Sequence, residues 1–354
     1  MTRRKMLGTL ACLPSLLNTV PPAAEPKPAD RTRLGVGMHS YGASWNAANR
    51  TSPAAPFNDA LSFLEHCHAL GAGGIQVGLA SWDAAYASKF RAKAESYQMY
   101  FEGDLRLPAD PSELDRFDAQ VRLAKEAGGT VIRTAMLNGR RYETFGTAEA
   151  FQEFSQRSWR ALTLAEPIVK KHGCRLAIEN HKDWLVPELL VMLHRMSSES
   201  VGVCVDTGNS IALVEDPMAV VEAYAPWAVS THIKDMAVQE FDRGFLLSEV
   251  PLGEGFLDLR RMSEILRQAN PRIRFNLEMI TRDPLRIPCL EEKYWTTLDQ
   301  VPGRHLAATI TMVKARASKQ PLPTVAGLDQ AGRIKFEDDN VRKCLAYARE
   351  HLGL

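Results

Sequence analysis

The stretch Leu176-Ala177-Ile178-Glu179 has three counterparts later in the chain. A short apolar or β-branched run ends in an acidic or imidazole side chain at Val203-Cys204-Val205-Asp206, Val229-Ser230-Thr231-His232 and Phe275-Asn276-Leu277-Glu278. Runs of this kind are typical of buried strands in a parallel sheet. Glu179, Asp206, His232 and Glu278 are therefore predicted to lie at the C-terminal ends of four strands.

Working outward from these four, we predict eight strands in all. They are Leu34–Met38, Gly74–Val77, Met99–Glu102, Thr130–Arg133, Arg175–Ile178, Gly202–Val205, Ala228–Ile233 and Arg274–Leu277. Amphipathic stretches between them predict helices, among them Ala60–Leu70, Asp115–Ala127, Ala148–His172 and Leu259–Gln268. This alternation is typical of repeated βα units around a parallel sheet.

The order of the elements favours a closed barrel over an open sheet. Glycines at Gly71, Gly128 and Gly173 stand where helices are expected to end before the next strand. We find no antiparallel hairpin signal over roughly 250 residues, which fits an α/β fold of the (β/α)₈ TIM-barrel type. The segments Thr281–Pro302 and Gln320–Lys335 are predicted to be loops, and Glu337–His351 to be the closing helix.

The N-terminus has a different composition. Thr2-Arg3-Arg4-Lys5-Met6-Leu7 leads into an apolar stretch and then into Pro21-Pro22-Ala23-Ala24, as in twin-arginine export signals. We predict a signal peptide at residues 1–24, a linker at 25–32 and the barrel at 33–354, with a disordered basic tail as the alternative for the first segment. A signal of this kind implies a periplasmic or secreted protein.

The bulk composition narrows the classes of ligand. The chain of 354 residues has 43 Lys and Arg against 42 Asp and Glu, so no overall field attracts nucleic acid. No other segment approaches the roughly 18 apolar residues of a membrane span, so no stable membrane insertion is expected. The six cysteines form no CxxC pair, which argues against a zinc ribbon. A small molecule is the expected partner, and a homo-oligomer is compatible with the sequence.

The four strand-end residues suggest a metal site. Strand C-termini meet at one face of a barrel, so three carboxylates and one imidazole would share a common space. This donor set suits Mn²⁺ or Mg²⁺, with Co²⁺ or Zn²⁺ as further options. Taken singly, each residue could instead cap a helix or form a salt bridge. Together, three carboxylates would repel one another unless a cation were bound.

Five motifs in order resemble the xylose-isomerase-like TIM barrels, the sugar phosphate isomerase/epimerase family. They are Ala177-Ile178-Glu179-Asn180-His181, Val205-Asp206-Thr207-Gly208-Asn209, Thr231-His232-Ile233-Lys234-Asp235, Pro251-Leu252-Gly253-Glu254-Gly255 and Asn276-Leu277-Glu278. The resemblance implies metal ligands at Glu179, Asp206, His232 and Glu278. It also implies that Glu179 and Glu278 transfer protons, as the corresponding glutamates do in ketose epimerases.

The sequence departs from the ketose epimerase pattern at two positions. Asn209 stands where those enzymes have a histidine, and Val238 where they have an arginine. The His232-x-Lys234-Asp235 phrase is nearer the dehydratase and generic isomerase branch. Lys234 is therefore expected to bind a substrate oxygen or act as an acid/base group, or else to pair with Asp235 or Glu254.

Further side chains are expected near the site. His39, His181, Asn209 and Arg282 are candidates for substrate binding, while Glu102 and Arg133 line the pocket or form a structural salt bridge. Trp45, Trp82 and Trp184 follow strand ends and stack against a sugar ring or pack in the core.

These residues support three hypotheses about function. The first is a metal-dependent isomerase or epimerase that removes a proton next to a carbonyl of a sugar or polyol derivative. Its rival is a lyase or dehydratase that acts by elimination on a keto-sugar or 3-keto-glycoside. A non-catalytic sugar-binding barrel is the alternative of another class. Repair of nucleic acid by an endonuclease IV type enzyme is disfavoured by the neutral charge, by Asn209 and by the export signal.

Overall fold

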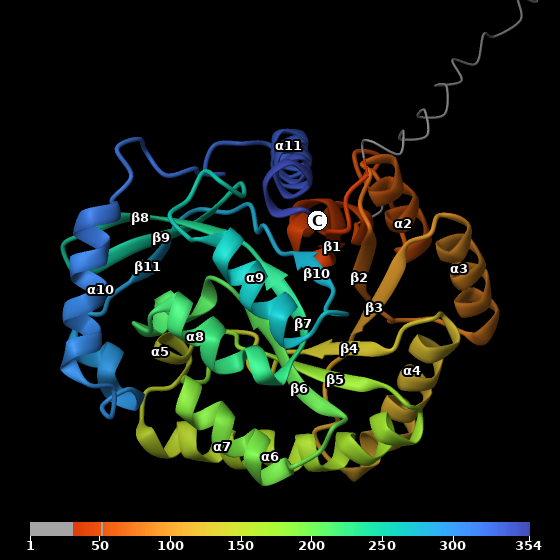
Figure 1. Cartoon of the computed structure of the whole chain (residues 1–354), viewed down its shortest axis with the longest axis horizontal. Helices are drawn as coiled ribbons and strands as arrows, with labels where there is room; N and C mark the ends of the chain where they lie inside the picture. Colours follow the sequence, from red (N-terminus) through yellow and green to blue (C-terminus); the bar gives the residue numbers. More distant parts are fainter. Residues whose placement is uncertain (1–30, 51) are drawn as a thin grey trace, which may run out of the picture.

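The eight predicted strands close into a barrel in the computed structural model, which describes residues 31–50 and 52–354 (Figure 1). They are β1 (Gly35–Gly37), β2 (Gly74–Gly78), β3 (Tyr100–Asp104), β4 (Val131–Thr134), β5 (Arg175–Glu179), β6 (Val201–Asp206), β7 (Ala228–Ile233) and β10 (Phe275–Leu277). Neighbouring strands are parallel, and β1 pairs with β10, so the sheet has no open edge. The (β/α)₈ TIM barrel is confirmed, and each predicted strand bound is within two residues of the observed one.

Helices surround the barrel and bury their apolar faces against it. They include α2 (Ala60–Ala69), α3 (Ala84–Ser96), α4 (Leu114–Glu126), α6 (Ala148–Lys171), α7 (Val186–Met196), α8 (Pro217–Tyr224) and α9 (Leu259–Ala269), with the short α1 (Gly42–Asn49) and α5 (Arg141–Thr144) in βα loops. In α6, the buried Leu162, Ala165 and Val169 recur at the spacing of one helix face. Gly71, Gly128 and Gly173 have positive φ, as expected at helix ends.

The expectation that the chain has no antiparallel hairpin is wrong. Directly after β7, β8 (Asp235–Phe241) and β9 (Gly244–Val250) form a hairpin, and β11 (Leu285–Ile287) adds to it as a third strand. A Cβ at Gly244 would meet the carbonyl oxygen of Ile287 at 2.0 Å, so a glycine is needed for β11 to approach. The small sheet packs beside the barrel against α10 (Gly303–Arg316), a helix that the sequence pattern did not reveal (Figure 1).

Two predicted loops are also partly wrong. Residues 281–302 contain β11 and a 3₁₀ helix at Glu292–Thr297, and the closing helix α11 (Gln330–Tyr347) begins inside the predicted loop Gln320–Lys335. The carboxylate of Asp329 accepts a hydrogen bond from the amide of Gly332 at 2.7 Å, which starts α11 earlier than expected.

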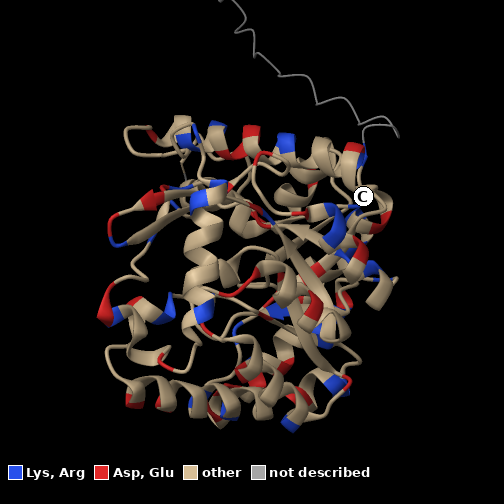
Figure 2. Ribbon diagram, turned by 60° about the vertical axis from the view of Figure 1, so that its left-hand side comes forward, with Lys and Arg blue, Asp and Glu red and all other residues tan. Residues whose placement is uncertain are grey.

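The surface of the described part carries charges of both signs on its outer helices (Figure 2). None of the helices in residues 31–50 and 52–354 combines the length and the apolar character that crossing a membrane requires. The predicted signal peptide and most of the linker, residues 1–30, lie outside the described residues.

The closing helix α11 is attached to the first βα loop by two carboxylates. Glu337 is buried and accepts hydrogen bonds from the amides of Ala43 and Ser44 at 2.6 and 3.0 Å. Asp338 accepts hydrogen bonds from Tyr41 and lies 3.0 Å from the ring of His66. The same loop contacts the end of β10, because the hydroxyl of Ser40, next to Tyr41, donates to the carbonyl of Leu277 at 3.1 Å. Leu277 directly precedes the metal-ligand candidate Glu278.

We expect Glu337→Ala to lower the free energy of unfolding by about 2–3 kcal/mol, because a buried and a half-buried amide lose their acceptor. Urea denaturation of the variant and of the wild type measures this difference. Glu264→Ala is the matched control, since its exposed side chain makes only a 3.9 Å ion pair with Arg261. Equal stability of the two variants would contradict the anchoring role of Glu337.

Candidate metal centre

The four strand-end residues converge as the sequence predicted. One ligand atom each from Glu179, Asp206, His232 and Glu278 lies within 4.8 Å of the other three, an arrangement that could hold a metal ion. All four side chains are buried. Glu179 and Asp206 are the last residues of β5 and β6, His232 is the last but one of β7, and Glu278 follows β10 directly.

The tautomer of His232 leaves one ring nitrogen free to bind a cation. Its Nε2 lies 2.6 Å from Oε1 of Gln76, and the amide nitrogen of Gln76 donates to Glu102 at 3.2 Å. Glu102 therefore fixes the oxygen of Gln76 toward His232, so that Nε2 carries a proton and Nδ1 is the nitrogen that a cation could take. Nδ1 is buried without a hydrogen-bond partner and lies 3.3 Å from Glu278 Oε1 and 3.4 Å from Glu179 Oε2.

Asp206 is held in place by main-chain groups. Its Oδ1 accepts hydrogen bonds from the amides of Gly208 and Asn209 at 2.8 and 2.7 Å. The side chain of Asn180 braces the same residue, accepting from its amide and donating to its carbonyl. Oδ2, by contrast, makes no directed hydrogen bond, although the ammonium of Lys234 is 2.8 Å away. This oxygen and Nδ1 of His232 both fit the role of metal ligands.

The charges around the centre also fit a divalent cation. The ion pairs join four carboxylates, those of Asp104, Glu179, Asp206 and Glu278, to two cationic side chains, Arg133 and Lys234. Buried carboxylates in excess of their counter-ions repel one another strongly. A bound divalent ion would neutralise the remaining charge of this network.

The two glutamates are kept ionised by the cations beside them. Burial alone would raise the pKa of Glu179, but the guanidinium of Arg133, with Nε at 2.7 Å, lowers it well below its usual range. Lys234 lowers the pKa of Glu278 in the same way, from 2.5 Å. Ionised carboxylates are good metal ligands, but a lowered pKa makes each of them a weaker general base.

Lys234 has other partners than those expected. Its ammonium lies between Asp206 and Glu278. It does not pair with Asp235, which accepts hydrogen bonds from the amides of Gly253 and Gly255, or with Glu254, which pairs with Lys343. Successive side chains of a strand point to opposite faces, so Asp235 at the start of β8 and the preceding Lys234 face different surroundings.

A cavity of about 340 Å³ opens onto Glu278 and contains most of the other candidates. His39, His181 and Arg282 line it, together with Arg133, Arg140 and Lys182. His39 lies 2.9 Å from Asp104, and Arg282 pairs with the buried Glu249 of β9. Burial and the nearby Lys182 lower the pKa of His181 to about 3, so its ring is neutral at neutral pH.

Asn209 lies beside this cavity and links the ligands to two lysines. Its amide nitrogen donates to Glu179 at 2.9 Å, and its oxygen accepts hydrogen bonds from both Lys182 and Lys234. Substrate binding by Asn209 stays a prediction, and its observed partners are Glu179 and the two lysines.

The prediction from the sequence missed several residues of the site and misplaced one. Glu102 does not end β3: it lies in mid-strand, buried against Ser230 and Asn276, while Asp104 ends the strand and contacts Arg133. Gln76, Lys182 and Glu249 were not singled out. Gln76 is the last residue but one of the predicted strand Gly74–Val77, and Asp104 follows the predicted strand Met99–Glu102 by two residues, so nearness to a strand end is the signal that could have identified them. Trp45, Trp82 and Trp184 pack against aromatic rings of the core.

Comparison with known proteins agrees with this geometry. The family model described as xylose isomerase-like TIM barrel matches residues 64–297. The chain belongs to this family. The 3-oxo-isoapionate decarboxylase of Pectobacterium atrosepticum is 26% identical over 240 residues, which are 66% of this chain and 81% of that enzyme.

Solved structures share the fold at lower identity. A xylose isomerase-like TIM barrel protein from Mycobacterium smegmatis, in complex with magnesium, has a TM-score of 0.54 and 16% identity, covering 78% of this chain and 97% of that one. A D-psicose 3-epimerase, in the presence of D-fructose, has a TM-score of 0.58 and 15% identity, covering 91% and 100%. At these identities the likeness concerns the fold alone.

We expect Asp206→Asn to lower divalent-metal affinity by at least about tenfold, because an anionic ligand becomes neutral while its size is kept. Metal content after dialysis, measured by elemental analysis, checks this expectation. Asp115→Asn, an exposed site on α4, should bind metal as the wild type does. Unchanged metal content in Asp206→Asn would exclude Asp206 as a ligand.

Proposed function

We propose that this protein is a divalent-metal-dependent enzyme that acts on a carbohydrate derivative with a carbonyl group. The observation that carries the proposal is the partnerless Nδ1 of His232, which faces three buried carboxylates at the mouth of a (β/α)₈ barrel. Glu179, Asp206, His232 and Glu278 would hold the ion, with Mn²⁺ or Mg²⁺ preferred. The bound ion supplies positive charge that polarises a substrate carbonyl and favours negative charge on its oxygen.

The cations of the cavity favour a lyase that acts on an oxo acid derived from a sugar. In decarboxylation of a 3-oxo acid, the bond between the carboxylate carbon and the next carbon breaks, and its electron pair moves toward the carbonyl. Carbon dioxide leaves, and the carbon then takes up a proton. This route needs no strong base, which suits the lowered pKa of Glu179 and Glu278. The similarity to a decarboxylase supports the same reaction type.

Lys182 is the side chain we assign to the substrate carboxylate. It is 2% exposed and lines the cavity, yet no carboxylate among the described residues lies within 4.0 Å of its ammonium. The other cations of the cavity are paired: Arg133 with Glu179, Arg140 with Glu143 and Arg282 with Glu249. Burial and Lys234 lower the pKa of Lys182 to about 8, so most of it remains charged at neutral pH. An unpaired buried ammonium favours an anionic partner.

Epimerisation or isomerisation of a sugar is the second candidate. It is favoured by the two glutamates that each place an oxygen within 3.4 Å of His232 Nδ1, since such enzymes use two proton-transfer groups. We place this reaction second because the chain differs from the ketose epimerase pattern at two positions. Asn209 stands in place of a histidine and has no titratable proton, and Val238 stands in place of an arginine and is buried in the small sheet.

A single assay separates the two reactions. Metal-loaded protein is incubated in deuterium oxide with a panel of 3-oxo sugar acids and neutral keto-sugars. Release of carbon dioxide from the acids supports the lyase, and deuterium exchange without loss of carbon supports the epimerase. No turnover of either class would favour the sugar-binding barrel. We also propose export by the twin-arginine pathway, which rests on Thr2–Leu7, the apolar stretch after it and Pro21-Pro22-Ala23-Ala24.

We expect Glu278→Gln to lower kcat by at least about a hundredfold with the fold intact. The proposed metal ligand, which also pairs with Lys234, would lose its charge. Steady-state kinetics and circular dichroism measure the two effects. Glu254→Gln, whose exposed side chain pairs with Lys343, is the matched control. Full activity of Glu278→Gln would exclude any role for this carboxylate in turnover.

We expect Lys182→Gln to raise KM for an acidic substrate by roughly tenfold or more, because a charge-assisted contact is lost. Turnover of a neutral keto-sugar should change much less, and metal content should stay the same. Lys343→Gln removes an exposed lysine and serves as the control. An equal loss on acidic and neutral substrates would show that Lys182 does not recognise the carboxylate.

A further inference from the structure

A second pocket, of about 680 Å³, lies at the end of the barrel opposite the metal centre. The residues that line it precede or begin barrel strands: Arg33 comes before β1, Gly73 before β2, Tyr100 begins β3, and Arg274 comes before β10. The metal centre is built from the other ends of the strands. The two sites are therefore separated by the length of the barrel.

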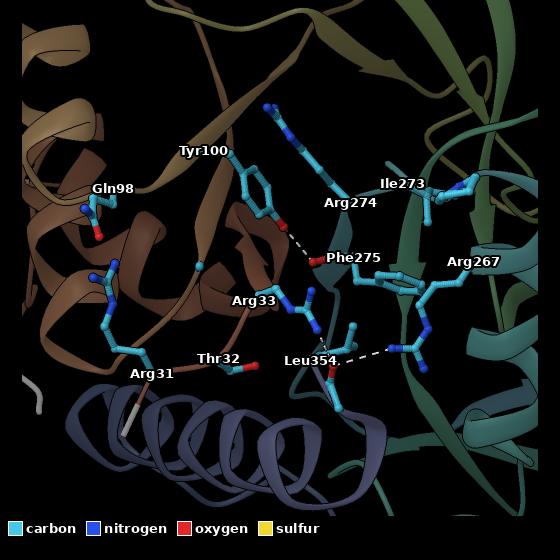
Figure 3. A pocket seen from close by; sticks show the side chains of 13 residues that line it. Arg31, Thr32, Arg33, Gln98, Tyr100, Arg267, Ile273, Arg274, Phe275 and Leu354 are labelled. Carbon is cyan, nitrogen blue, oxygen red and sulfur yellow. Dashed lines mark hydrogen bonds between the residues drawn. The ribbon is translucent and has the colours of Figure 1, made fainter. Parts of the chain in front are cut away.

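Four arginines line this pocket, and no Asp or Glu side chain does. They are Arg31, Arg33, Arg267 and Arg274 (Figure 3). Among the described residues, the ion pairs include none of these four guanidinium groups. Arginines of the outer helices, by contrast, pair with glutamates, as Arg91 does with Glu95 and Arg122 with Glu126. The net charge of the whole chain is only +1, so the positive charge is a local feature of this pocket.

Main-chain carbonyls, which carry no net charge, accept the hydrogen bonds of Arg33 and Arg267. Arg33 and Arg267 both donate to the carbonyl of Gly353, at 3.0 and 3.5 Å, and Arg267 also donates to Leu352 at 3.0 Å. Figure 3 shows these two side chains meeting from opposite sides of the pocket. Two guanidinium groups that share one carbonyl oxygen are close enough to repel each other. An anion between them would relieve this repulsion.

Aromatic rings stiffen the upper wall of the pocket. The guanidinium of Arg274 lies 4.8 Å from the ring centre of Tyr100 and donates to the carbonyl of Phe101 at 3.2 Å. The hydroxyl of Tyr100 donates to the carbonyl of Phe275 at 2.6 Å, which links β3 to β10. Each guanidinium has five N–H groups, and these contacts use only one or two of them. Donors therefore remain for a ligand.

We infer that this pocket binds a small polyanion, a molecule with two or more phosphate or carboxylate groups. Arginine forks bind such groups with paired hydrogen bonds, and several preplaced arginines favour several anionic groups on one ligand. The volume lies in the range of roughly 300–1,000 Å³ that is usual for small-molecule sites. The inference does not depend on the proposed reaction, because none of its residues belongs to the metal centre.

The test is calorimetric titration of the metal-loaded full chain with inorganic phosphate and with fructose 1,6-bisphosphate at fixed ionic strength. We expect the bisphosphate to bind at least about tenfold more tightly than phosphate. The double variant Arg33→Gln/Arg267→Gln should weaken it by a similar factor, and Arg274→Gln should weaken it less. The matched control is Arg122→Gln/Arg261→Gln, which removes two arginines that pair with glutamates on outer helices.

Two further outcomes separate this site from the catalytic cavity. Binding that survives Lys182→Gln but is lost in the double arginine variant supports the inference, provided that circular dichroism shows the variant to be folded. Binding that is lost in Lys182→Gln would place the bisphosphate in the catalytic cavity and overturn the inference. Equal affinity of wild type and double variant, or no binding by the wild type, would leave the arginines as structural contacts to residues 352 and 353.

Discussion

The site depends on the repulsion among buried carboxylates at the mouth of the barrel. Glu179, Asp206 and Glu278 meet there without enough water to screen them, and Asp104 adds a fourth negative charge. Arg133 and Lys234 compensate for only part of this charge. A divalent ion bound at this centre would offset the remaining charge and so lower the free energy of the folded chain. The hydrogen bonds of Gln76, Asn180 and Asn209 act in the same direction, since they fix the ligand atoms before any ion binds.

The small antiparallel sheet extends the barrel in a way that matters for the site. It begins immediately after His232 and Lys234, and its strand β9 provides Glu249, which holds Arg282 at the cavity wall. With Arg282, Arg133 and Arg140 all paired, Lys182 is the lysine left to interact with a substrate. This arrangement is the reason for placing decarboxylation of an oxo acid before epimerisation of a neutral sugar.

Different charged groups gather at the two ends of the barrel. Carboxylates converge at the C-terminal ends of the strands, whereas Arg33, Arg267 and Arg274 gather at the N-terminal ends without acidic side chains. Because the whole chain is nearly neutral, neither concentration of charge is visible in its composition. A cation at one end and a polyanion at the other would both reduce the repulsion that the fold creates.

The sequence by itself determined the barrel and its four strand-end residues. The apolar runs specify the strands locally, and a closed parallel barrel brings their C-terminal ends to one face whatever the details of packing. Only the tertiary structure decided which side chains meet. His232 and Gln76 are 156 positions apart, and Lys234 faces Asp206 and Glu278 instead of its neighbour Asp235. Such contacts depend on the register between strands and on the direction of each side chain, and the pattern of apolar runs in the sequence specifies neither.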